Sequence, residues 1–257
     1  MKNTYLKLEI TDRVALVTID RPEKKNALSP EVLAEVEAVF TALDADPDVH
    51  VVVFTGGEHF FSAGFDLNFI RTIEKNSNED FTALFHRAYR AVLFCGQPVI
   101  AAVGGPAIAG GFDLTMMCDI RYASERAKFG QREIALSLTP ILDPLWRIIG
   151  LGRAKEVALT GRIYGAAEAE QMGYVSRVFP EGKLVASVMA IAKSMAAYDR
   201  QCLRETKELS NALLNQDLGG AMKTQEWLFR TYIGAPDNHR RIDALLESLR
   251  KKASSPD

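Results

Sequence analysis

Cysteine is scarce in this sequence, and its few copies lie far apart. Cys95, Cys118 and Cys202 are odd in number and widely spaced, which excludes a disulfide framework like those of small secreted proteins. The four histidines show no metal-ligand spacing with these cysteines or with one another. We therefore expect a cytoplasmic protein in a reducing compartment, without a metal site.

The sequence also lacks long apolar runs and an excess of charge of one sign. No apolar run reaches the roughly 18 residues that a membrane-spanning helix needs. The N-terminal stretch MKNTYLKLEI contains no apolar block of the kind found in signal peptides. Lysine and arginine total 31 against 33 acidic residues, which gives a net charge of −2. A nucleic-acid-binding surface requires concentrated positive charge, so we expect neither a nucleic acid nor a membrane as a partner.

The composition that remains is typical of a globular protein. The 257 residues are 47% hydrophobic and 25% charged, and a chain of this length buries a full core without covalent staples. Strand-like and helix-like segments alternate in the first part of the chain, which favours an α/β fold with parallel strands. The expected elements are hairpin strands Tyr5–Ile10 and Val14–Ile19, a helix that begins at Ser29-Pro30, buried strands Val49–Thr55 and Val99–Val103, and a helix over about Phe81–Phe94.

The pattern changes after Gly150, where helical periodicity dominates and only Tyr174–Phe179 resembles a strand. We expect an α/β core over residues 1–195 and a helical oligomerisation region over residues 196–257. The apolar stripes of the second region are too wide for a monomer. They contain Leu203, Leu209, Leu213, Met222, Trp227 and Leu228.

Two glycine-rich segments, residues 56–67 and 104–113, each follow a buried strand. Neither segment fits a dinucleotide fingerprint, a phosphate-binding P-loop or a serine nucleophile elbow. Glycines that precede a helix allow close backbone approach, and helix N-termini present free N–H groups. The two segments therefore either form tight turns only or aim two N–H groups at one point as an oxyanion hole.

Several segments in a fixed order resemble the crotonase superfamily, which contains the enoyl-CoA hydratases and isomerases. Phe61–Leu67, FSAGFDL, resembles its F-x-A-G-x-D-[LI] segment, and Ile100–Leu114 resembles its second glycine-rich segment. The other matching segments are Arg21-Pro22 with Asn26-Ala27-Leu28, Met117–Ala123, and Phe129–Glu133. The resemblance implies a spiral of ββα units with a helical trimerisation region, assembled as a trimer or a dimer of trimers. It also implies an acyl-CoA thioester substrate and no cofactor besides coenzyme A.

The same resemblance implies roles for particular residues. The N–H groups of Phe65 and Gly110 would hold the thioester oxygen, and Asp113 and Glu133 would be the catalytic carboxylates. Coenzyme A would contact Lys24, Lys25, Ala27, Ala63, Asp66 and Leu67. Asn76, Ser77 and Asn78 would belong to a mobile loop at the acyl tunnel.

The sequence departs from the family at three places near these residues. Asp113 stands where the hydratases usually carry glutamate, so its carboxylate reaches about 1.5 Å less far. Asp143 lies in a bulky loop that replaces a glycine-rich one, and we expect it to be the N-cap of a helix that begins with Pro144. Arg132 precedes Glu133, and we expect its positive charge to lower the pKa of Glu133.

The reaction that these features favour is the addition of water to a 2-enoyl-CoA, because hydration uses two carboxylates. An enoyl-CoA isomerase that uses Glu133 alone is the principal alternative. A thioesterase or a decarboxylase on this fold is a further alternative. A catalytically silent or RNA-binding scaffold is disfavoured by the presence of Glu133 and Gly110 and by the lack of a basic segment.

Overall fold

The computed structural model describes residues 4–74, 79–213 and 217–253, so the predicted loop at Asn76–Asn78 lies outside the described residues. The chain divides into two compact units, residues 1–207 and residues 208–257. The strands are β1 (Leu6–Thr11), β2 (Val14–Ile19), β3 (Val51–Thr55), β4 (Val99–Val103), β5 (Ala107–Ile108), β6 (Ile120–Ser124), β7 (Lys128–Gly130), β8 (Tyr164–Gly165) and β9 (Arg177–Phe179). The helices are η1 (Pro22–Lys24), α1 (Pro30–Ala45), α2 (Leu67–Ile70), α3 (Glu79–Leu93), α4 (Gly110–Met116), η2 (Glu133–Leu136), α5 (Leu145–Ile149), α6 (Leu151–Thr160), α7 (Ala166–Gln171), α8 (Leu184–Ala196), α9 (Arg200–Leu213), α10 (Leu218–Tyr232) and α11 (Pro236–Ala253), where η marks 3₁₀ helices.

A six-stranded sheet in the order β1-β2-β3-β4-β6-β9 forms the centre of the first unit. The hairpin pair β1 and β2 is antiparallel, and every other neighbouring pair is parallel. A smaller sheet, β5-β7-β8, stands apart from it. The predicted hairpin and parallel strands are confirmed. The weak signal at Tyr174–Phe179 becomes the shorter strand β9, and β8 was not predicted because two residues carry no periodicity.

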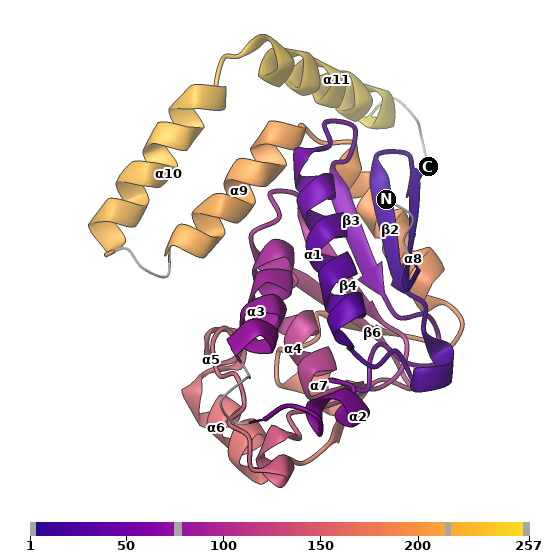
Figure 1. Cartoon of the computed structure of the whole chain (residues 1–257). Helices are drawn as coiled ribbons and strands as arrows, with labels where there is room; N and C mark the ends of the chain where they lie inside the picture. The colour runs from indigo at the N-terminus through magenta and orange to yellow at the C-terminus, as the bar shows by residue number, and fades with distance from the viewer. Residues whose placement is uncertain (1–3, 75–78, 214–216, 254–257) are drawn as a thin grey trace. The chain divides into compact units, whose positions relative to one another are not determined.

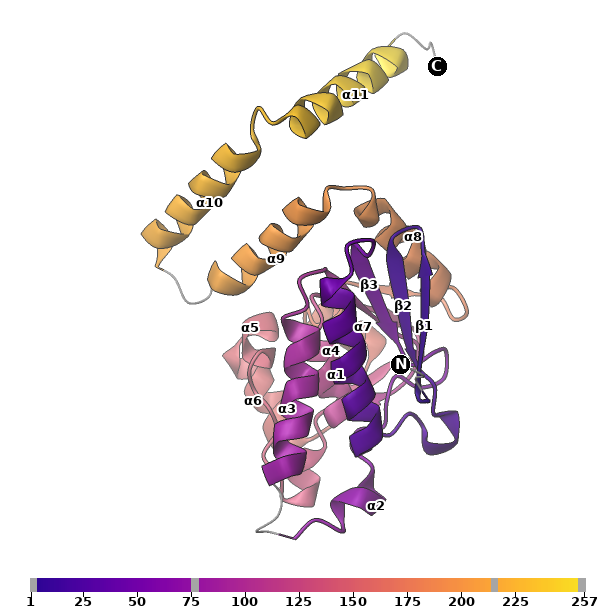
Figure 2. The same cartoon turned by 45° about the horizontal axis from the view of Figure 1, so that its top comes forward.

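Both faces of the central strands β3 and β4 are buried: successive side chains point to opposite faces, and all of them are covered. Val51 and Val53 of β3 pack with Leu184, Val188 and other apolar residues of α8. On the opposite face, the alternate residues of β3 join the larger core with α1 and α3. Figures 1 and 2 show α1 and α3 side by side on one face of the sheet and α8 on the other. This double cover explains why β3 and β4 have continuous apolar sequences.

The parallel strands deliver two loops to the same edge of the sheet. β3 ends at Thr55 and β4 ends at Val103, and the glycine-rich segments follow these ends. Helix α1 begins as predicted, with Ser29 Oγ accepting a hydrogen bond from the N–H of Val32 at 3.5 Å. No helix in the described part of the chain is long and apolar enough to cross a membrane.

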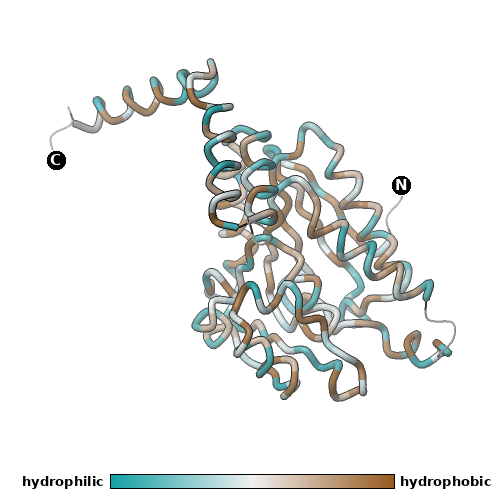
Figure 3. Tube along the Cα trace, turned by 90° about the vertical axis from the view of Figure 1, so that its left-hand side faces the viewer, coloured by the Kyte–Doolittle hydropathy of each residue, from teal (hydrophilic) through white to brown (hydrophobic). Residues whose placement is uncertain are grey.

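The second unit consists of helical segments with apolar and polar residues interspersed. Figure 3 shows hydrophobic and hydrophilic residues alternating along α11 toward the C-terminus. Met222 and Trp227 of α10 are exposed, as are Leu245 and Leu249 of α11. Oligomerisation through residues 196–257 stays a prediction.

Candidate active site

Asn26 and Ser62 hold the loop that follows β3. Asn26 Nδ2 donates to the carbonyl oxygens of Gly56, Phe60 and Phe61 at 2.9, 3.2 and 3.2 Å. Ser62 Oγ donates to the carbonyl oxygen of Asn26 at 2.7 Å and accepts from the N–H of Gly64 at 3.1 Å. Both side chains are buried. The asparagine of the matching R-P-x-x-x-N-A-L segment therefore shapes this loop through its amide.

The two glycine-rich loops touch each other at Gly64. The N–H of Ile108 donates to the carbonyl oxygen of Ser62 at 3.0 Å, which joins the loops. Gly64 has a φ of +92°, and a Cβ there would lie 2.8 Å from Ile108 O and 3.2 Å from Gly110 N. Only glycine fits this conformation and this approach without strain. This contact holds the backbone at Gly64, the residue before Phe65, close to the N-terminus of α4.

Two backbone N–H groups at this junction are free to bind a ligand. Among the hydrogen bonds of the described residues, none uses the N–H of Phe65 or of Gly110 as a donor. Gly110 is the first residue of α4, where N–H groups have no acceptor within the helix and the helix dipole is positive. The preceding Ala109 has the unusual φ and ψ of 50° and −127° at this turn. These are the two N–H groups expected to form an oxyanion hole, and that binding role stays a prediction.

The two predicted carboxylates are both buried in the first unit. Glu133 begins η2 and is 7% exposed, and Asp113 lies in the first turn of α4 and is 2% exposed. Neither carboxylate oxygen of Glu133 has a hydrogen-bond partner among the described residues. Asp113 Oδ1 accepts from Gln131 Nε2 at 3.2 Å. Unpaired buried acid oxygens are costly, and such groups concentrate at functional sites.

Burial changes the acidity of both groups. Burial raises the pKa of Glu133 above its ordinary value. Burial and then the nearby charge of Glu133 raise the pKa of Asp113 well above its ordinary value, although the hydrogen bond from Gln131 opposes this change. Two neighbouring carboxylates resist double ionisation, so the pair favours one protonated and one ionised member.

The expectation that Arg132 lowers the pKa of Glu133 is wrong. Arg132 Nη1 donates instead to the carbonyl oxygen of Gly161 at 2.7 Å. The pKa of Glu133 is raised, and its burial is the main cause. Although Arg132 and Glu133 are adjacent in sequence, the guanidinium group of Arg132 does not bind the carboxylate of Glu133.

The expectation that Asp143 caps α5 is also wrong. Helix α5 spans Leu145–Ile149 as predicted, but Pro144 is its N-cap residue and no side chain caps it. Asp143 Oδ1 accepts instead from Arg147 Nε at 2.8 Å, and this hydrogen bond lowers the pKa of Asp143. Asp143 is therefore exposed in an ion pair, unlike the two buried carboxylates.

A mostly apolar cavity of about 250 Å³ opens beside Glu133. Phe65, Ala63 and Leu67 from the predicted set line it, whereas Asp113 and Gly110 are not among its lining residues. Its other lining residues, which the sequence analysis did not assign to an acyl pocket, are Ile70, Ile108, Ala109, Arg132, Ala135, Leu136 and Leu138.

The remaining predicted coenzyme A contacts lie outside the cavity lining. Asp66 is the N-cap of α2, where its Oδ1 accepts from the N–H of Asn68 at 3.1 Å, and its Oδ2 pairs with Arg21 Nη1 at 3.1 Å. Lys24 and Lys25 are exposed and Ala27 is half-buried. The carbonyl oxygen of Lys25 accepts from the N–H of Ala63 at 3.0 Å, so this segment borders the loop of Phe65.

Two residues near the carboxylates were not predicted from the sequence to belong to the site. Gln131 binds Asp113, and its amide also donates to the carbonyl oxygen of Ile141 at 2.6 Å. Tyr89 lies on the buried face of α3, where apolar periodicity predicts burial but does not indicate what the hydroxyl binds. No group of histidine, cysteine and acidic residues in the described part of the chain could hold a metal ion.

Known proteins resemble this chain in sequence and in fold. The pattern of the enoyl-CoA hydratase/isomerase family matches residues 9–253. A Mycobacterium bovis protein titled a probable enoyl-CoA hydratase is 35% identical over 243 residues, 93% of this chain and 94% of that protein. The crotonyl-CoA hydratase of Syntrophomonas wolfei is 33% identical over 244 residues, 93% of this chain and 94% of that protein.

The solved structure of an enoyl-CoA hydratase from Bacillus anthracis has a TM-score of 0.91 and 30% identity, and the match covers 95% of this chain and 97% of that one. This likeness confirms the predicted crotonase-like α/β fold. Because the family pattern spans nearly the whole sequence, the chain belongs to the enoyl-CoA hydratase/isomerase family.

Proposed function

We propose that this protein is an enoyl-CoA hydratase that adds water across the double bond of a 2-enoyl-CoA. The observation that carries the proposal is the burial of Asp113 and Glu133 beside two free backbone donors. Relatives over nearly the whole chain bear the names enoyl-CoA hydratase and crotonyl-CoA hydratase, which supports the same reaction.

The chemistry follows from the charges that develop during hydration. The N–H groups of Phe65 and Gly110 stabilise the thioester oxygen as it becomes an enolate oxygen. The ionised carboxylate of the pair takes a proton from water while the water oxygen bonds to the β-carbon. The protonated carboxylate gives its proton to the α-carbon. The raised pKa of Asp113 supports a pair that carries one proton between its two members.

Coenzyme A is the carrier of the acyl group, and the reaction uses no other cofactor. We assign its contacts to Ala63 and Leu67 in the cavity wall and to Lys24, Lys25, Ala27 and Asp66 on the adjoining segments. The enzyme works as a homo-oligomer, a trimer or a dimer of trimers, in the cytoplasm. The buried thiols of Cys95 and Cys118, both free, fit a reducing compartment.

Double-bond migration is the second candidate because only Glu133 of the two carboxylates lines the cavity. A single carboxylate suffices to move a proton from the α-carbon to the γ-carbon of a 3-enoyl-CoA. In that reaction Asp113 would neither touch the substrate nor exchange a proton with it.

The test is a panel of acyl-CoA thioesters incubated with the purified enzyme and examined by liquid chromatography and mass spectrometry. Hydration adds the mass of one water to a 2-enoyl-CoA, whereas isomerisation leaves the mass unchanged and moves the chromatographic peak. Free coenzyme A indicates thioester hydrolysis, and loss of carbon dioxide indicates decarboxylation. We expect the gain of one water, and its absence across the panel contradicts the proposed function.

A further inference from the structure

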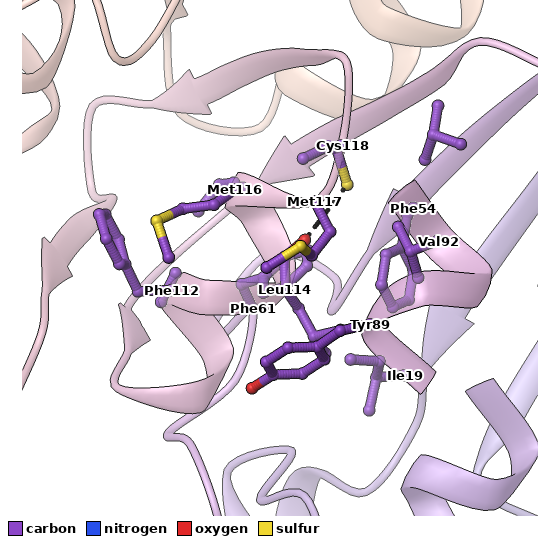
Figure 4. Packing of buried hydrophobic residues seen from close by; sticks show 14 of the residues in the cluster. Ile19, Phe54, Phe61, Tyr89, Val92, Phe112, Leu114, Met116, Met117 and Cys118 are labelled. Carbon is purple, nitrogen blue, oxygen red and sulfur yellow. Dashed lines mark hydrogen bonds between the residues drawn. The ribbon is translucent and has the colours of Figure 1, made fainter. Parts of the chain in front are cut away.

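Tyr89 is a buried tyrosine that the proposed chemistry does not use. It lies on α3, one and two helical turns after Phe85 and Phe81, and its side chain is 2% exposed. Figure 4 shows Tyr89 among the buried residues of the core, with its hydroxyl directed away from the sulfur atom of Cys118. A buried tyrosine hydroxyl normally requires a hydrogen-bond partner, so the identity of that partner is informative.

The partner of the hydroxyl is the first residue of α4. Tyr89 Oη donates to the carbonyl oxygen of Gly110 at 3.0 Å. A Cβ on Gly110 would lie 3.0 Å from Tyr89 Oη, so the tyrosine hydroxyl packs directly against this glycine. The contact therefore restrains the same residue whose N–H is one of the two free donors.

Helix α3, which carries Tyr89, also contacts Phe65, whose N–H is the other free donor. The ring of Phe85 lies 5.5 Å from that of Tyr89 and 5.3 Å from that of Phe65. Phe81, on the same face of α3, lies 5.2 Å from the ring of Phe65. One face of α3 thus contacts both residues that offer a free N–H.

The surroundings keep the hydroxyl in its donor form. Burial, followed by the nearby charges of Asp113 and Glu133, raises the pKa of Tyr89 well above its ordinary value. A neutral hydroxyl that donates to a carbonyl oxygen keeps its orientation throughout the pH range in which the carboxylates titrate.

We propose that Tyr89 is a positioning residue, which sets the direction of the Gly110 N–H toward the thioester oxygen through its hydrogen bond to the Gly110 carbonyl. The role rests on the proposed function, since it concerns the donors that the enolate requires. Preorganised donors stabilise a developing oxyanion, and misplacement by about 1 Å costs about 100-fold in rate. Tyr89 acts on the substrate only through Gly110.

The test compares Tyr89→Phe with Tyr174→Phe, because both tyrosines bind α4 through their hydroxyls. Tyr174 Oη lies 2.6 Å from Thr115 Oγ1 and donates to the Phe112 carbonyl oxygen at 3.4 Å. Both variants lose a buried hydroxyl that binds α4, but only Tyr89→Phe loses the bond at Gly110. We expect Tyr89→Phe to lower kcat about 10-fold or more with little change in KM, and Tyr174→Phe to keep the parent kcat.

A spectroscopic readout separates positioning from general loosening. A bound cinnamoyl-CoA absorbs at longer wavelength when hydrogen bonds polarise its carbonyl group. We expect this red shift to be reduced in Tyr89→Phe and unchanged in Tyr174→Phe, at temperatures where both proteins are folded. Equal effects in the two variants, an unchanged red shift in Tyr89→Phe, or no red shift in the parent enzyme would overturn the inference.

The two proposals fail in different ways. If the parent enzyme hydrates no 2-enoyl-CoA, the proposed function fails, while the red shift still reports on Tyr89. If the parent enzyme hydrates its substrate and Tyr89→Phe matches it in kcat and red shift, only the role of Tyr89 fails.

Discussion

Glu133 occupies a position that favours chemistry over stability. Its carboxylate oxygens are buried without partners in the described part of the chain, and its pKa is raised by burial. The folded protein therefore binds a proton at Glu133 more tightly than the unfolded chain does. Stability falls as pH rises from about the ordinary value of 4.5 through the raised pKa, and it increases again as pH falls.

Replacement of Glu133 by glutamine should separate activity from stability. We expect kcat to fall at least about 100-fold, because a general acid–base group is lost. We also expect the free energy of unfolding at pH 7 to rise by about 1 kcal/mol, since the variant buries no charge. Thermal unfolding at several pH values measures this gain, which should fade as pH falls toward 4.5. A variant that is less stable at pH 7 than the parent contradicts the account of Glu133.

The sequence motifs predicted two catalytic acids, whose role stays a prediction, but they did not predict what neighbouring side chains bind. Glu133 and Asp113 follow from the resemblance of their segments, and burial of both agrees with it. Arg132 and Asp143 were misjudged because adjacency and capping preference ignore distant acceptors, here the Gly161 carbonyl and the Arg147 guanidinium. Tyr89 binds Gly110 across 21 positions, a contact that only the packing of α3 on α4 creates.

At the scale of elements, the contact between the two glycine-rich loops determines whether the donors converge. Gly64 and Gly57 both have positive φ, +92° and +85°. A Cβ on Gly64 meets the backbone of the second loop, whereas a Cβ on Gly57 has nothing within 4 Å. The two glycines therefore form a matched pair with equal backbone strain and unequal contact.

We expect Gly64→Ala to lose about 100-fold in kcat, because the added methyl group pushes Ile108 and Gly110 away from Phe65. Gly57→Ala should cost about 1 kcal/mol of stability and little activity, since it adds only backbone strain. Steady-state rates and melting temperatures of both variants measure the difference. Equal rates in the two variants would show that the approach of the loops is not required.

Helix α9 is tied to the sheet by a buried ion pair within the first unit. Lys207 is 7% exposed, and its Nζ lies 2.8 Å from Asp119 Oδ2 and 3.1 Å from the carbonyl oxygen of Gln97. Asp119 Oδ2 also accepts from the N–H of Val99 at 2.7 Å. The pair thus connects α9 to the start of β4.

Lys207→Met should destabilise the protein by up to about 3 kcal/mol, because the half-buried charge of Asp119 then loses its cation. The exposed pair between Lys193 and Asp12, at 2.9 Å, provides the control. Lys193→Met should change the free energy of unfolding by less than about 1 kcal/mol. Urea unfolding of both variants measures these differences, and equal small effects would refute a stabilising role for the buried pair.

Among the elements, the long periodic segments were predicted, and so was the short helix α5, but the two-residue strands were not. The strands β3 and β4 and the helices α1 and α3 have apolar patterns that span several residues, so their type follows from the sequence. The two-residue strands β5 and β8 exist because partner strands lie beside them, and η2 is too short for a period. Of these short elements, β5 ends at Ile108, two residues before Gly110, and η2 begins at Glu133.

In the molecule as a whole, the second unit carries many exposed large apolar side chains, which is why we predict that it forms an interface between subunits. The exposed apolar residues of this unit are Leu218, Met222, Trp227, Phe229, Ile233, Ile242, Leu245, Leu246 and Leu249. We expect light scattering to give the mass of a trimer or of a dimer of trimers at micromolar concentration. A monomeric mass under these conditions contradicts the predicted oligomerisation region.

If Asp113 and Glu133 act together to add water, the loss of Asp113 should change one ratio of rates. The measurement is the rate of 2-enoyl-CoA hydration divided by the rate of 3-enoyl-CoA isomerisation, in the parent enzyme and in Asp113→Asn. Asparagine keeps the shape of the side chain but cannot exchange a proton. We therefore expect the hydration rate to fall at least about 100-fold in Asp113→Asn, whereas the isomerisation rate should change little. Hydration at the parent rate in Asp113→Asn would contradict the two-carboxylate mechanism.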